Sequence, residues 1–162
     1  MQDTANIKRI VETYSDMILR IAYQHTLNMH DAEDIAQEVF LSIIKQNMKN
    51  FTSEHEKAYI IKATINKCKS FHRKNSNLNI VYLDEIYQNP NEPDFTNQEQ
   101  TLLNEIRMLD KKYRDVLYLH YYEGYKASQI AKILGTTTGT VTSQLKRGRE
   151  KLKIILKEEN YG

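Results

Sequence analysis

Hydroxyl groups precede cations within residues 135–149, which read GTTTGTVTSQLKRGR. Threonine and serine hydroxyls can cap a helix or contact bases and phosphates. Thr137 or Thr138 is the expected N-cap of a helix here, but a cap leaves the later hydroxyls unexplained, because threonine is a mediocre helix former. The candidate base-contacting residues are Thr138, Thr140, Thr142 and Ser143, and the candidate phosphate-contacting residues are Lys146, Arg147 and Arg149. The alternative interpretation is a solvated basic face.

A second basic stretch, KAYIIKATINKCKSFHRK at residues 57–74, contains no acidic residue, and aromatic residues are interspersed with its cations. Phosphate attraction combined with base stacking is what binding of single-stranded DNA requires. The Asn66 amide carries donors and an acceptor, so it can read a base edge; the alternative is a buried amide in a packing network. The candidate residues are Tyr59, Lys62, Asn66, Lys69, Arg73 and Lys74.

An acidic helix face is predicted within DAEDIAQEVF at residues 31–40. Asp31 is the expected cap of this helix, and its apolar residues recur with helical spacing. The polar residues that lie off the apolar stripe include Asp34, Gln37 and Glu38. By itself, such a face is most often solvated.

Composition argues against several other classes of site. The five histidines form no pair at i, i+4, so we expect no metal site, and the chain has neither a nucleophile motif nor a glycine-rich phosphate loop. We therefore expect no catalytic residue and no cofactor. The single cysteine, Cys68, favours a reducing, cytoplasmic setting. No apolar run approaches the ~20 residues of a membrane span, so we expect no direct membrane insertion.

The elements that carry these residues are predicted to be helical throughout, in an all-α fold of two small domains joined by a linker. Residues 76–100 contain both prolines, five acidic residues and no Lys or Arg, which is typical of a linker. The predicted domains are residues 1–75 and residues 101–162. In the second domain, ASQIAKILG and the helix that follows the threonines are separated by a short turn, which predicts a helix-turn-helix.

These stretches, in this order, resemble an extracytoplasmic-function (ECF) sigma factor of the bacterial sigma-70 superfamily. DAEDIAQEVF is similar to the family's helix for binding the clamp of RNA polymerase, and AYIIKATINKCKSFHRK is similar to its promoter-melting and −10-reading segment. LDKKYRDVLYLHYYEGYKASQIAKILGTTTGTVTSQLKRGREKL is similar to its −35-reading domain. The resemblance covers nearly the whole chain outside the linker. It implies core RNA polymerase and promoter DNA as partners, together with an anti-sigma factor.

Individual residues follow from the resemblance. It places Asp34, Gln37 and Glu38 on the polymerase clamp and Asn66 on the asparagine of the −10-reading helix. This sequence departs from the family elsewhere: Thr142 and Gln144 stand where Lys or Arg is frequent, and Gly148 stands where Ala is usual. The loss of two cations implies a different −35 element or weaker phosphate contacts.

Two other functions are consistent with parts of the sequence. A helix-turn-helix regulator that binds duplex DNA without polymerase would explain residues 101–160 but not the acid-free stretch. A small nucleic-acid enzyme would require clustered acids or histidines for a metal, and the sequence lacks them.

Overall fold

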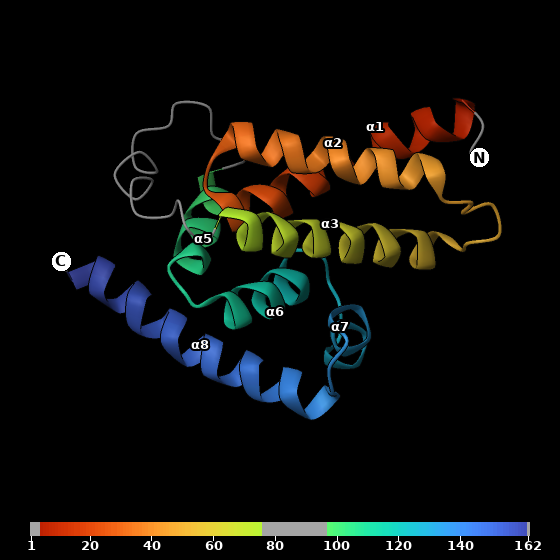
Figure 1. The fold of residues 1–162 in the computed structure, drawn as a ribbon. Helices are drawn as coiled ribbons and strands as arrows, with labels where there is room; N and C mark the ends of the chain where they lie inside the picture. The colour runs from red at the N-terminus through yellow and green to blue at the C-terminus, as the bar shows by residue number, and fades with distance from the viewer. Residues whose placement is uncertain (1–3, 76–96, 162) are drawn as a thin grey trace. The chain divides into compact units, whose positions relative to one another are not determined.

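The computed structural model describes residues 4–75 and 97–161 (Figure 1). Within these ranges there are seven helices and no strand, which confirms the all-α prediction. The helices are α1 (Thr4–Thr26), α2 (Met29–Lys45), α3 (Ser53–Asn75), α5 (Asn97–Arg107), α6 (Lys111–Tyr121), α7 (Ala127–Leu134) and α8 (Thr138–Tyr161).

Helices α1, α2 and α3 pack pairwise against one another in a first compact unit. Helices α2 and α3 run side by side in opposite directions and are joined at one end by residues 46–52 (Figure 1). Apolar residues at helical spacing on all three helices meet in the core. Its fully enclosed members include Ile10, Ile18, Ala22, Ala32, Val39, Ile60, Ile61 and Cys68.

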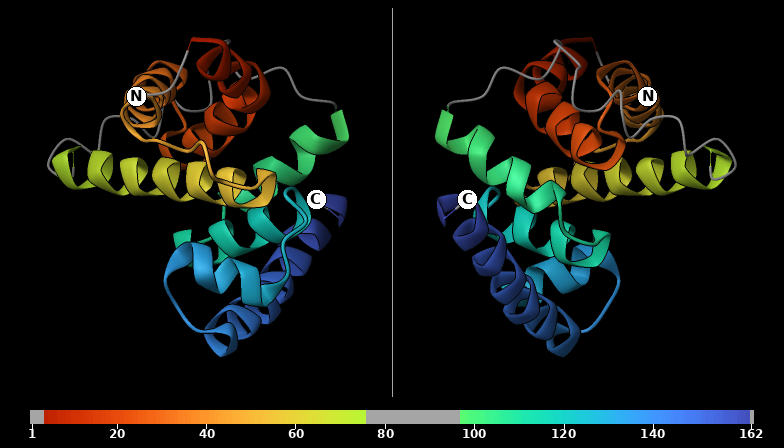
Figure 2. Two further views of the ribbon diagram at one scale, coloured as in Figure 1. Left: turned by 90° about the vertical axis from the view of Figure 1, so that its right-hand side faces the viewer. Right: turned by 90° about the vertical axis from the view of Figure 1, so that its left-hand side faces the viewer.

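Helices α5 to α8 form the second unit, in which the long α8 contacts each of the other three (Figure 2). Helix α8 approaches α6 closely at Gly148. A Cβ atom at this position would lie 3.0 Å from Leu117 Cδ1 and 3.3 Å from Tyr113 Cβ. An alanine at residue 148 would therefore require Leu117 or Tyr113 to move by a few tenths of an ångström.

Helices α7 and α8 form the predicted helix-turn-helix. Helix α7 ends at Gly135, whose φ of 71° is left-handed and favours glycine. The Gln129 side chain accepts a hydrogen bond from the Lys126 backbone N–H at 2.9 Å, which caps the start of α7. The Thr137 hydroxyl accepts one from the Thr140 backbone N–H at 3.2 Å, so Thr137 is the cap of α8.

One predicted cap is wrong. Asn28, not Asp31, is the N-cap of α2, because the Asn28 side chain accepts a hydrogen bond from the Asp31 backbone N–H at 3.0 Å. Asp31 lies within the first helical turn instead. Most of the predicted linker, residues 76–96, lies outside the described residues, and residues 97–100 belong to the beginning of α5.

Candidate nucleic-acid and protein interfaces

One face of α3 presents a row of polar side chains. Lys62, Asn66, Lys69 and Arg73 are all exposed, and their spacing of three or four residues aligns them along the helix. Since residues 57–74 include no acid, single-stranded phosphates would meet only positive charge along this row. The exposure of Asn66 excludes the alternative of a buried structural amide. Lys74 is also exposed but lies off the row.

An aromatic cluster stands at the N-terminal end of the same face. The rings of Phe51 and His55 stack with centroids 3.9 Å apart and an interplanar angle of 17°. The Tyr59 ring meets Phe51 edge-on at 5.7 Å. Tyr59 and Phe51 are half-buried, whereas His55 is exposed. Sequence reasoning missed His55, although the spacing of 51, 55 and 59 could have indicated it. The row and the cluster together offer cations, a base-reading amide and ring faces on one surface.

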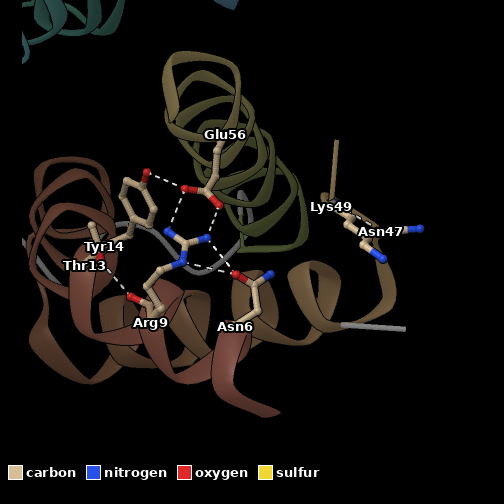
Figure 3. A network of polar contacts seen from close by, with 7 residues as sticks. All are labelled: Asn6, Arg9, Thr13, Tyr14, Asn47, Lys49 and Glu56. Carbon is tan, nitrogen blue, oxygen red and sulfur yellow. Dashed lines mark hydrogen bonds and ion pairs between the residues drawn. The ribbon is translucent and has the colours of Figure 1, made fainter. Parts of the chain in front are cut away.

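A buried carboxylate, Glu56, directly follows the cluster residue His55 in the first turns of α3. The Glu56 side chain receives two hydrogen bonds from Arg9, at 2.5 and 3.1 Å, and one from the Tyr14 hydroxyl at 2.8 Å (Figure 3). Arg9 is braced in turn by Asn6, whose side-chain oxygen lies 2.8 Å from Arg9 Nη2. The hydrogen bonds from Arg9 lower the pKa of Glu56 below its usual value, although burial alone would raise it. Glu56 is therefore held as a charged, fully engaged carboxylate.

The predicted acidic face on α2 is exposed. Asp34, Gln37 and Glu38 all point away from the core, while Ile35 and Val39 are buried. The side chain of Leu41, one helical turn beyond Gln37 and Glu38, is 58% exposed. Sequence reasoning did not single out Leu41, because a lone exposed leucine is ordinary at the surface. An exposed apolar side chain beside carboxylates suits a protein interface better than a purely solvated face.

The seven predicted residues of α8 are all exposed: Thr138, Thr140, Thr142, Ser143, Lys146, Arg147 and Arg149. The apolar side chains of Val141, Leu145 and Leu152 hold the opposite face against the unit's core. The Thr142 hydroxyl donates to the Thr138 carbonyl at 2.9 Å, so in this conformation Thr142 offers chiefly its methyl group outward.

An open hollow of about 520 Å³ lies between α8 and the beginning of α6. It divides the predicted α8 residues, because Thr140, Ser143 and Arg147 line it and the other four do not. Sequence reasoning did not assign the other side chains that line it, which include Lys112, Tyr113 and Gln144. The hollow places cations from two helices beside a row of hydroxyls, an arrangement suited to a polyanion.

Among residues 4–75 and 97–161, no three His, Cys, Asp or Glu side chains are grouped as metal ligands. None of the helices described there is long and apolar enough to cross a bilayer.

Two family models match this chain. The model of sigma-70 region 2 matches residues 10–78, which include the whole of α2 and α3. The model of sigma-70 region 4 matches residues 99–152, which include the helix-turn-helix. The acidic face of α2 and the basic row on α3 therefore fall inside region 2. The hydroxyl-rich face of α8 falls inside region 4 of the same family.

Curated relatives span most of the chain. The ECF RNA polymerase sigma factor SigE of Mycolicibacterium smegmatis is 26% identical over 155 residues, covering 91% of this chain and 60% of that protein. The ECF RNA polymerase sigma factor SigW of Bacillus subtilis is 28% identical over 167 residues, covering 92% of this chain and 88% of that protein.

Two solved structures share the fold. The sigma factor RpoE from Bartonella quintana, solved with the anti-sigma factor NepR, matches with a TM-score of 0.72 at 19% identity, covering 94% of this chain and 97% of that one. CnrH, solved with the cytosolic domain of CnrY, matches with a TM-score of 0.68 at 16% identity, covering 96% and 90%.

Proposed function

The chain belongs to the sigma-70 family, as an ECF-type sigma factor, and on that premise we propose that it binds core RNA polymerase and directs promoter recognition, DNA melting and transcription initiation. Its first domain, residues 1–75, docks on polymerase and opens DNA. Its second domain, residues 101–162 together with residues 97–100 at the start of α5, reads the −35 element, and residues 76–96 link the two. The polymerase performs the chemistry, so the chain is not itself an enzyme, and it acts in the cytoplasm.

The observation that carries this function is the exposed row on α3. Opening a duplex costs pairing and stacking energy, and an extruded base bound by a polar side chain offsets part of it. Asn66 is the residue in the row with both donors and an acceptor, and it lies between Lys62 and Lys69. The amide reads a base of the −10 strand, while Tyr59 offers a ring and Arg73 and Lys74 attract phosphates.

The α2 face docks on the polymerase clamp. Asp34 and Glu38 supply negative charge, Gln37 supplies an amide and Leu41 an apolar contact. Complementary charges steer association, and an apolar side chain at the centre of an interface strengthens the complex.

The exposed face of α8 enters the major groove at −35. Hydroxyls near its N-terminus approach base edges, and Lys146, Arg147 and Arg149 contact phosphates. The anti-sigma factor NepR, which is bound to the structural neighbour from Bartonella quintana, supports an anti-sigma factor as a further partner of this chain.

A polymerase-independent helix-turn-helix regulator is not favoured, because that alternative leaves the region 2 match over residues 10–78 unexplained. The test is transcription by core RNA polymerase and the purified protein from a promoter library. We expect enrichment of a −35 and a −10 element only when both proteins are present. Promoter selection by this protein without polymerase, or no selection with it, would contradict the proposal.

A further inference from the structure

We propose that Arg9, Tyr14 and Glu56 form a positioning network that holds the Phe51–His55–Tyr59 cluster in place to stack on an unpaired base beside Asn66. This inference rests on the proposed function and adds to it a specific role for residues of α1, which contribute nothing to the row on α3. The three network residues touch no DNA in this proposal and act only through the cluster.

The network joins parts of the chain that are distant in sequence. Arg9 and Glu56 are 47 residues apart, and their side chains meet through two N–H groups and two carboxylate oxygens. The Tyr14 hydroxyl donates to the oxygen, Oε2, that also accepts from Arg9 Nη1. The planar guanidinium of Arg9 and the hydroxyl of Tyr14 together restrict the Glu56 carboxylate to one position and one orientation.

Glu56 is embedded in the segment that displays the rings. It directly follows His55 and lies three residues before Tyr59, on a face turned toward the core. Its backbone N–H donates to the Thr52 carbonyl at 2.9 Å, and the His55 N–H donates to the Thr52 hydroxyl at 3.1 Å. Restraining the Glu56 side chain therefore also restrains the first turn of α3 and Thr52, the residue that follows Phe51.

Stability alone does not account for such a network. The Glu56 side chain is 7% exposed, and burying a charge carries a desolvation cost that apolar residues of similar size avoid. What apolar packing cannot supply is a directional restraint on one helical turn. Stacking on a base requires rings held at a defined height and angle, so a directional restraint is useful at this place in the fold.

The test uses the full chain with core polymerase and promoters premelted at −10, so that strand opening is not limiting. Each promoter set varies the bases across −10, with 2-aminopurine at each position in turn to report stacking. Arg9→Lys keeps the charge and loses the fork, and Tyr14→Phe removes one hydroxyl from a side chain that is nine-tenths buried. The matched control is Ile43→Val, which trims the buried core of α2 and removes none of the network's hydrogen-bonding groups.

We expect both network variants to bind core polymerase as the wild type does. We expect base discrimination at one −10 position to fall about tenfold in Arg9→Lys and about threefold in Tyr14→Phe, which is the range expected for the loss of a hydrogen bond. Quenching of 2-aminopurine at that position should also be weaker in both variants. Ile43→Val should lower the melting temperature without changing discrimination. If both network variants showed the same base discrimination and the same 2-aminopurine quenching as the wild type, the network would have only a structural role. A wild-type protein that selects no −10 base would instead defeat the proposed function itself.

Discussion

Replacing Asn66 with alanine tests the proposed −10 contact most directly. The side chain is exposed and lies on the face of α3 opposite the buried Ile61, Ile65 and Cys68. Its removal leaves no cavity and no buried unpaired group, so we expect the free energy of unfolding to change by less than about 0.5 kcal/mol. Binding to core polymerase should also stay unchanged, because the proposed clamp face lies on α2.

The expected functional loss follows from the contact itself. A base-edge hydrogen-bond pair is worth about 1–3 kcal/mol of discrimination, which corresponds to roughly 5- to 150-fold in the preference for one base. Lys62 and Lys69 flank Asn66 on the same row and remain in the variant, so general attraction to the strand persists. The loss should therefore appear as selectivity at one −10 position rather than as weaker binding to every sequence.

Permanganate footprinting on duplex and premelted promoters separates opening from discrimination. Asn66→Ala should open the duplex promoter poorly, and a premelted bubble should restore opening but not the base preference. Lys62→Ala is the matched control, because it removes an exposed cation from the same row and should weaken binding to all sequences with a shallower salt dependence. Equal opening by Asn66→Ala and wild type, with the same preference at every −10 position, would refute the role of Asn66.

Four further outcomes are expected. Arg147→Ala should weaken binding to all −35 variants alike and reduce the salt dependence of holoenzyme binding, and an unchanged salt slope would place Arg147 away from phosphate. The double change Asp34→Lys with Glu38→Lys should weaken core-polymerase binding at least tenfold without unfolding the protein, as a pull-down with circular dichroism would measure; wild-type binding by the folded variant would return this face to solvent. Gly139→Ala places a Cβ in open space, so the melting temperature should rise by the equivalent of about 0.4–1 kcal/mol, while −35 binding should weaken if α8 approaches DNA there; unchanged or tighter binding would argue against that approach. Because the pKa of Glu56 is lower in the folded state, its contribution to stability should be complete above about pH 4.5 and be lost as pH falls through the folded pKa, so acid titration of Glu56→Gln should show a flatter acid limb than wild type.

Helical periodicity alone predicted the architecture because both units are built from amphipathic helices. Ile35, Val39 and Ile43 recur at i, i+4 and i+8 on α2, and all three are buried. The helix-turn-helix was equally accessible, since Gly135 requires a left-handed conformation that few other residues adopt. The cap of α2 was misplaced by three residues because Asn28 and Asp31 are both good caps, and only the backbone geometry distinguishes them.

The exposed site residues were also within reach of sequence reasoning, because polar residues off an apolar stripe point to solvent. The hollow beside α8 was not, because Lys112 and Tyr113 approach Thr140 and Arg147 only through the packing of α6 on α8. The two helices lie close together at Gly148, where an added Cβ would lie 3.0 Å from Leu117 Cδ1. Spacing along α8 alone could not indicate that contact between the two helices.

Glu56 shows most clearly what sequence reasoning could not supply. An acid in the first turn of a helix is ordinarily explained by the helix dipole, and that explanation needs no partner. The dipole, however, favours an exposed carboxylate as much as a buried one, and Glu56 is 5% exposed with three donors around it. Glu56 is a fully paired buried charge within the helical turn that carries His55 and Tyr59, and in the proposal above it restrains that turn and so connects α1 to the capture of the −10 strand. Comparing base selectivity at −10 in Arg9→Lys and in Ile43→Val therefore decides whether α1 only supports the fold or also helps to set which base is held.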